Sequence, residues 1–210
     1  MNVSDFKKQP ILGIVRGVNA NQIESLINTV IISGLKTLEI TMNTDNAAKL
    51  IRRAKELTKD KLTLGAGTVL NMRDLKEALD SGATFIVTPV FVKDVTAYCA
   101  KNKIPVFPGA LTPNEIYRAW QEGATMVKVF PAKCFGPEYF KEIKGPFQDI
   151  ELLAVGGITP ENIQEYFNNG ASAAAFGASV FRKDWLEKQE YRKIVSSIKN
   201  YLNQLNQERE

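Results

Sequence analysis

A lysine interrupts an otherwise apolar segment, Thr125-Met-Val-Lys128-Val-Phe-Pro131. Side chains alternate between the two faces of a strand, so Met126, Lys128 and Phe130 would share one face and the two valines the other. The valines suit the face beneath helices, which turns Lys128 toward the interior. An amine held in apolar surroundings has a lowered pKa and can attack a ketone carbonyl. The segment therefore predicts a lysine that forms a Schiff base.

A glutamate stands in a similar position in the strand-like segment Leu35–Thr41. Alternation directs Leu38 and Ile40 outward and Glu39 inward, into the same shielded space as Lys128. The sequence contains no histidine, so this glutamate is the best candidate for moving protons through water. The alternative is a buried ion pair that only fills the interior. Its location near strand ends favours the catalytic interpretation.

Glycines end two other apolar segments, in Val155-Gly156-Gly157 and in Phe176-Gly177-Ala178-Ser179. Backbone N–H groups can approach an anion closely only where no side chain intervenes. These loops therefore predict a phosphate site, with plain turn glycines as the alternative.

Two further features suggest contacts to a small substrate. Gly65-Ala-Gly67-Thr68 ends another segment and offers a close backbone approach and a hydroxyl. Arg16 ends the first segment and could pair bidentately with a carboxylate, although it could also be an ordinary surface arginine.

Composition limits the classes of function. Without histidine, a Ser-His-Asp triad and a His-ligated zinc are excluded. A net charge of +4 suits an acidic small molecule and is too thinly spread for nucleic-acid binding. Cys99 and Cys134 form no CxxC pair and are expected to be ordinary thiols. No apolar run reaches the length of about 18 residues that spans a bilayer, and the first residues lack a signal-peptide core, so a cytoplasmic protein without membrane association is expected.

Elements that would position these residues recur along the chain. Four helical stretches each end in a glycine that precedes an apolar run, and four more apolar runs lie between them. The eight predicted strands are Ile11–Val15, Leu35–Thr41, Leu62–Gly67, Thr84–Pro89, Ile104–Phe107, Thr125–Phe130, Leu152–Val155 and Ser172–Gly177. Even alternation of strands with helices predicts an α/β fold, a (β/α)8 TIM barrel, with a doubly wound sheet as the alternative.

No linker divides the chain, so residues 1–210 are predicted to form a single domain. Residues 184–205 place apolar side chains at helical spacing, which predicts one C-terminal helix that packs on the barrel or on a neighbouring subunit.

Taken together, the sequence resembles the 2-keto-3-deoxy-6-phosphogluconate, 6-phosphogalactonate and 4-hydroxy-2-oxoglutarate aldolase family from about residue 10 to 182. The segments that carry the resemblance are Gly13-Ile-Val-Arg-Gly17, Leu38-Glu-Ile-Thr41, Gly65-Ala-Gly-Thr-Val69, Ile86-Val-Thr-Pro89, Phe107-Pro-Gly109, Lys128-Val-Phe-Pro-Ala132, Gly136-Pro137, Lys144-Gly-Pro-Phe147 and Gly156-Gly-Ile158.

The resemblance implies a class I aldolase, an aldehyde-lyase without metal or organic cofactor and a homotrimer. Lys128 matches the Schiff-base lysine and Glu39 the glutamate that moves protons. The implied reaction cleaves a 2-keto-3-deoxy-6-phospho sugar acid reversibly to pyruvate and glyceraldehyde 3-phosphate. The other matching positions surround the substrate, whose pyruvyl part would lie against Arg16, Gly67, Thr68 and Pro89, with Asn43, Phe130 and Val155 nearby and with Gly156, Gly157, Gly177, Ala178 and Ser179 on the phosphate.

Three positions depart from the pattern of the gluconate-specific members. Asn43 stands where these often have Arg, Val155 where they often have Thr, and Ala178 where many members have a second glycine. Val155 is more similar to the galactonate type, so the galactonate configuration is expected at least as much as the gluconate one. The alternatives are a 4-hydroxy-2-oxoglutarate aldolase that yields pyruvate and glyoxylate, a phosphosugar isomerase or epimerase, and a sensor barrel without catalysis.

Overall fold

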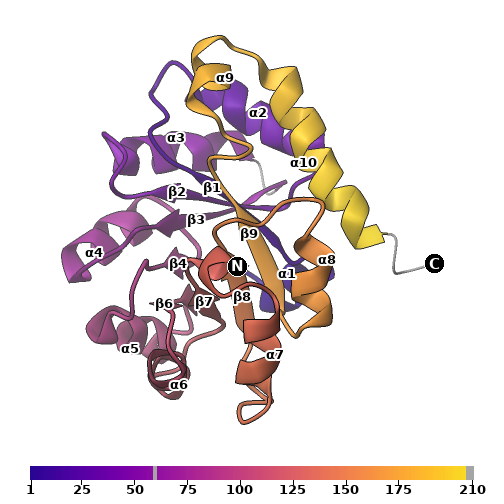
Figure 1. The fold of residues 1–210 in the computed structure, drawn as a ribbon. Helices are drawn as coiled ribbons and strands as arrows, with labels where there is room; N and C mark the ends of the chain where they lie inside the picture. The colour runs from indigo at the N-terminus through magenta and orange to yellow at the C-terminus, as the bar shows by residue number, and fades with distance from the viewer. Residues whose placement is uncertain (59–60, 207–210) are drawn as a thin grey trace.

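Parallel strands close into a barrel in the computed structural model, which describes residues 1–58 and 61–206 (Figure 1). Within these ranges the strand order is β5-β4-β3-β2-β1-β9-β8-β7-β6, and every pair is parallel. The bounds are β1 Ile11–Val15, β2 Thr37–Thr41, β3 Thr63–Gly67, β4 Ile86–Val87, β5 Val106–Phe107, β6 Gly109–Ala110, β7 Val127–Val129, β8 Leu152–Val155 and β9 Ala173–Phe176. Only Pro108 separates β5 from β6, so these two form one interrupted strand that closes the ring. The predicted (β/α)8 barrel is thus confirmed, and the doubly wound alternative is wrong.

Helices alternate with the strands and surround them (Figure 1). Gly34, the predicted helix-ending glycine, has φ 88° and donates its N–H to Ile31, which ends α2 as expected. No helix within the described ranges is long and apolar enough to cross a membrane. The bounds are α1 Val3–Lys8, α2 Ile23–Ser33, α3 Ala47–Thr58, α4 Met72–Asp80, α5 Lys93–Lys101, α6 Pro113–Gln121, the 3-10 helix η1 Ala132–Cys134, α7 Glu138–Lys144, α8 Ile163–Asn168, α9 Lys183–Glu187 and α10 Tyr191–Asn206.

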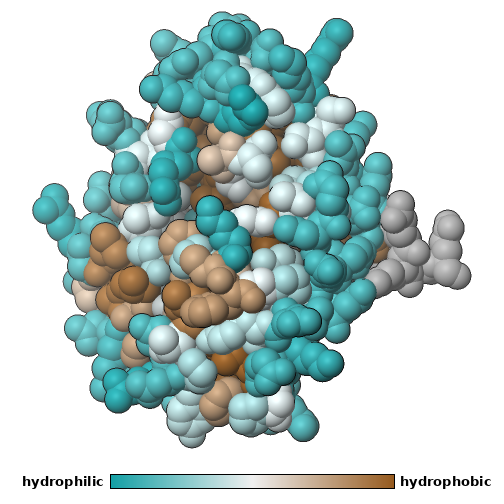
Figure 2. Space-filling model, in the orientation of Figure 1, coloured by the Kyte–Doolittle hydropathy of each residue, from teal (hydrophilic) through white to brown (hydrophobic). Residues whose placement is uncertain are grey.

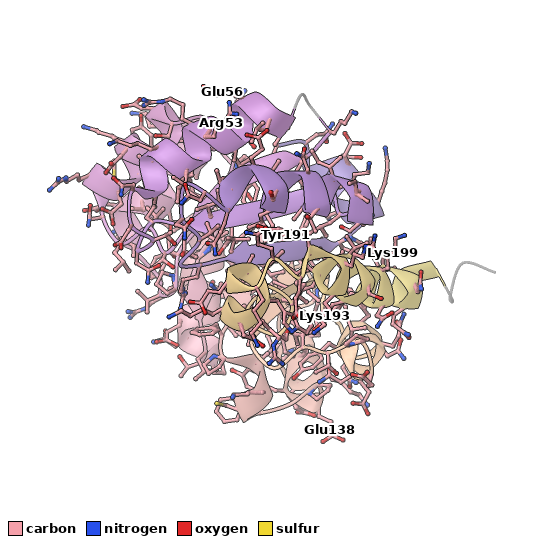
Figure 3. The ribbon with its side chains drawn as sticks, turned by 90° about the horizontal axis from the view of Figure 1, so that it is seen from above. Arg53, Glu56, Glu138, Tyr191, Lys193 and Lys199 are labelled. Carbon is pink, nitrogen blue, oxygen red and sulfur yellow. The ribbon has the colours of Figure 1, made fainter. Side chains whose placement is uncertain are left out.

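The predicted single helix at 184–205 is wrong in one respect, because the chain forms α9 and α10 with a break between them. Gln189 adopts a left-handed φ of 55° at this break, a conformation that an α-helix does not continue through. Tyr191 and Lys199 mark the course of α10 in Figure 3, where it runs beside α2. Ile194 and Ile198 are fully buried. The apolar face of this helix therefore packs on the barrel of its own chain.

The amino-terminal end of the barrel is filled by apolar side chains. Helix α1 was not predicted, and it lies at this end, with the terminal amine bonded to the Thr84 carbonyl just before β4. Its Phe6 enters the barrel interior and stacks on Phe107 at 5.8 Å between ring centroids. Met126 and Val155 belong to the same interior cluster. Polar interior residues are consequently confined to the opposite, carboxyl end.

Candidate active site

Lys128 is buried in the middle of β7, with only 7% of its surface exposed. Met126 lies in the interior cluster while Val127 and Val129 belong to the outer one, so the predicted inward face of this strand is confirmed. Burial lowers the pKa of the Lys128 ammonium, because a charged group loses hydration there. The Glu39 charge opposes this shift and the Arg16 charge adds to it. The amine is thus biased toward its neutral, nucleophilic form.

Glu39 is 1% exposed and lies in β2, the second of the two strands that carry an inward charge. Burial raises its pKa to about 7, although the positive charges of Lys128 and Arg16 act against the rise. Within the described ranges, its Oε2 atom has no hydrogen-bond partner. A carboxyl group that titrates near neutral pH with a free lone pair can accept and return a proton.

Gly67 makes room for this carboxyl group. It pairs with Thr41 in the register of β2 and β3, and a Cβ placed on it would lie 2.1 Å from Glu39 Oε1. Any side chain here would displace the carboxylate, which explains the glycine. The next residue, Thr68, has a left-handed φ of 55°, so the chain turns sharply directly beside Glu39.

Arg16 follows β1 at the carboxyl end of the barrel and is exposed, yet its charge acts on both Glu39 and Lys128. The loop that carries it is fixed to the end of β2. Gly17 N–H donates to Thr44 Oγ1 at 3.0 Å, and Thr44 Oγ1 lies 3.1 Å from Thr41 Oγ1. Sequence reasoning did not single out Thr44.

Phe130 connects the lysine to the loop after β8. Its ring centroid lies 5.1 Å from Lys128 Nζ, a cation–π distance. On the other side, a Cβ on Gly156 would lie 3.3 Å from the same ring. A continuous surface therefore runs from the amine to this glycine.

The two glycine loops are residues 155–158 after β8 and residues 177–179 after β9. Gly156 and Gly157 have φ values of 94° and 86°, which leave their backbone free of side-chain obstruction. Gly157 packs on the stem of Lys133. Ala178 and Ser179 are exposed, and Gly177 is partly so. Both loops leave the carboxyl end of adjacent strands, where parallel barrels bind anions.

A close backbone approach also occurs beside Lys128. Gly109 lies opposite Lys128 in the register of β6 and β7. A Cβ on Gly109 would lie 2.2 Å from the Pro89 carbonyl oxygen, so only glycine allows this approach. The Phe107-Pro-Gly109 segment contributed to the resemblance but was not predicted as a site, because the sequence does not reveal what Gly109 faces.

Asn43 does not lie with the residues around Lys128 in the contacts described. It lines a groove of about 920 Å³ between the loops after β1 and β2, and its role in substrate binding stays a prediction. The groove is polar, with Gly17, Val18, Asn19, Ala20, Asn21, Ile23, Asn43, Thr44, Asp45, Asn46, Lys49, Leu50 and Arg53 along its walls. Arg53 is already paired with Glu24 and with Glu56, which is labelled beside it on α3 in Figure 3.

Comparison with known proteins identifies the family. The model of the KDPG and KHG aldolases matches residues 3–197. The chain belongs to this aldolase family. It is 30% identical over 195 residues to the 2-dehydro-3-deoxy-6-phosphogalactonate aldolase of Escherichia coli (strain K12), covering 92% of this chain and 95% of that one. It is 37% identical to the 2-dehydro-3-deoxy-phosphogluconate aldolase of Pseudomonas aeruginosa over 134 residues, 63% of this chain and 60% of the relative.

Solved structures agree with the sequence comparison. A structure described as native KDPGal superposes with a TM-score of 0.87 at 29% identity, and the match covers 94% of both chains. The protein is accordingly a TIM-barrel aldehyde-lyase.

Proposed function

We propose that this aldolase cleaves a 2-keto-3-deoxy-6-phospho sugar acid to pyruvate and glyceraldehyde 3-phosphate, with Lys128 as the Schiff-base nucleophile. The observation that carries the proposal is the pair of buried charges at one end of the barrel. The pKa of Lys128 is lowered and that of Glu39 is raised to about 7. Opposed shifts of this kind prepare one group to attack and the other to exchange protons near neutral pH.

The first stage joins substrate and enzyme. The neutral Lys128 amine attacks the C2 carbonyl, and loss of water from the carbinolamine gives an iminium ion. The substrate carboxylate next to C2 suits Arg16, whose guanidinium is exposed at the same end of the barrel and can bind it bidentately. Phe130, over the amine, keeps bulk water from one side of the new bond.

The second stage breaks the carbon–carbon bond. Glu39, acting through a water molecule, takes the proton of the C4 hydroxyl. The C3–C4 bond then breaks, its electron pair moves to the iminium as an enamine, and C4 leaves as the aldehyde. The proton returns to C3, and hydrolysis of the iminium releases pyruvate and the free amine.

The glycine loops support a phosphorylated substrate. Gly156 lies against Phe130, so an anion on these loops would be held at the far end of a chain bound to Lys128. We favour the galactonate configuration at C4, which the name of the Escherichia coli relative and the buried Val155 beside the loop support. The contacts that distinguish the two configurations are worth about 1–3 kcal/mol. Turnover of both phosphorylated acids decides between them.

The decisive test is borohydride reduction in the presence of pyruvate, followed by mass spectrometry of peptides. A pyruvyl adduct on the peptide that contains Lys128 is expected, and Lys128→Met should abolish it. Lys199→Met, a surface change on α10, is the matched control. An adduct on another lysine, or no adduct on the folded protein, would contradict the assignment.

We further propose that the enzyme is a homotrimer. Large apolar side chains are exposed after the carboxyl ends of three strands, namely Leu70, Val90, Phe130 and Phe135. Figure 2 shows apolar surface gathered on this face. Two further copies of the chain are the expected cover. Val90→Lys should lower the mass found by analytical ultracentrifugation, whereas Ile32→Lys on α2 should not. A monomeric wild-type protein would refute this assembly.

A further inference from the structure

One side chain of the C-terminal helix touches both glycine loops. The Tyr201 hydroxyl donates a hydrogen bond to the Ile158 carbonyl at 2.9 Å, and Ile158 directly follows Gly157. The same hydroxyl lies 3.3 Å from Ser179 Oγ in the second loop. A residue from α10 thus joins two loops that are about 20 positions apart in the sequence and more than 20 positions before it.

Tyr201 is held firmly. The side chain is 2% exposed, and its ring lies 4.5 Å from that of Phe176, the last residue of β9. A buried phenol needs a hydrogen-bond partner, and the Ile158 carbonyl supplies it. Burial also raises the pKa of the phenol, so the hydroxyl remains a donor at neutral pH.

The sheet itself does not fix the spacing of these loops. The register between β8 and β9 extends only to Val155 opposite Ala175 in the described residues. An anion bound by backbone groups of both loops needs them at a set separation, because hydrogen bonds weaken steeply when they lengthen or bend. The Tyr201 hydroxyl bridges the loops just beyond the last paired residues.

We propose that Tyr201 is a positioning residue for the phosphate end of the substrate, one that sets the separation of the two glycine loops from outside the site. This inference rests on the proposed function, since it assumes that these loops hold the phosphate. Tyr201 does not touch the substrate. The C-terminal helix therefore contributes to substrate selection as well as to packing.

The test compares two substrates in Tyr201→Phe, which keeps the ring that packs on Phe176. The readout is the ratio of kcat/KM for the 6-phosphorylated acid to that for unphosphorylated 4-hydroxy-2-oxoglutarate. The ratio should fall roughly tenfold, the effect of one well-formed hydrogen bond. Tyr191→Phe, on the same helix but with no hydroxyl hydrogen bond in the described part of the chain, should leave it unchanged. Restoring a donor with Tyr201→4-aminophenylalanine should recover the ratio.

Pyruvate–borohydride labelling of Lys128 separates this inference from the proposed function. The adduct forms without a phosphate group, so it reports folding and the iminium step alone. A labelled Tyr201→Phe protein with an unchanged ratio, or with equal losses on both substrates, would overturn the positioning role. Failure to label wild-type Lys128 would instead overturn the proposed function. If Tyr201→Phe is not labelled, the amino variant decides: a labelled protein with the wild-type ratio supports the role, and one with a lowered ratio contradicts it.

Discussion

Replacing Glu39 by Gln should change how stability depends on pH. Burial raises the pKa of this carboxyl from 4.5 to about 7. The stability that the neutral carboxyl contributes is fully present below pH 4.5 and is lost as pH rises through about 7. At about 1.4 kcal/mol per pKa unit, the wild type should lose about 3 kcal/mol relative to Glu39→Gln between pH 4 and pH 8.

Urea denaturation, followed by tryptophan fluorescence, measures this difference at both pH values. Glu115→Gln is the control with the opposite sign, because backbone N–H groups of Thr112 and Leu111 lower the pKa of that exposed carboxyl. Its stabilising effect is present above its unfolded pKa and disappears as pH falls. If the stability difference between wild type and Glu39→Gln did not change with pH, Glu39 would ionise as freely in the folded chain as in the unfolded one. The assignment of a base that titrates near neutrality would then fail.

Three further changes test the site. The pH profile of kcat/KM should rise with pH through about 7, because Glu39 must be ionised to accept the C4 hydroxyl proton; Glu39→Gln should lack this limb and lose on the order of 100-fold or more in kcat, and a wild-type profile flat from pH 5 to 8 would argue against this base. Gly67→Ala should displace the carboxylate and reduce kcat by a similar factor, whereas Gly145→Ala, on the surface after α7, should not; a fully active Gly67→Ala enzyme would show that the packing does not matter. Lys133→Gln should raise the KM of the phosphorylated acid and leave that of 4-hydroxy-2-oxoglutarate unchanged, because the lysine stem packs on Gly157; equal effects in steady-state kinetics would contradict a phosphate contact.

Local patterns in the sequence predicted much of the fold. Two of the eight strands, Ile11–Val15 and Leu152–Val155, have the predicted bounds, and the others begin or end within a few residues of them. Alternation also placed Lys128 and Glu39 correctly on the inner face. These properties depend on neighbours along one strand, so a single sequence is enough to reveal them.

The sequence by itself determined which groups are available for chemistry: an inward amine, an inward carboxyl and glycines at strand ends, without histidine. Only the tertiary structure decided how these groups affect one another. The pKa of Glu39, its fit against Gly67 and the bridge from Tyr201 all arise between residues distant in the sequence. The same holds for Phe6, which closes the far end of the barrel from a helix too short to show a periodic pattern. Such contacts exist only once the barrel has closed, because closure sets both the distances and the exclusion of water.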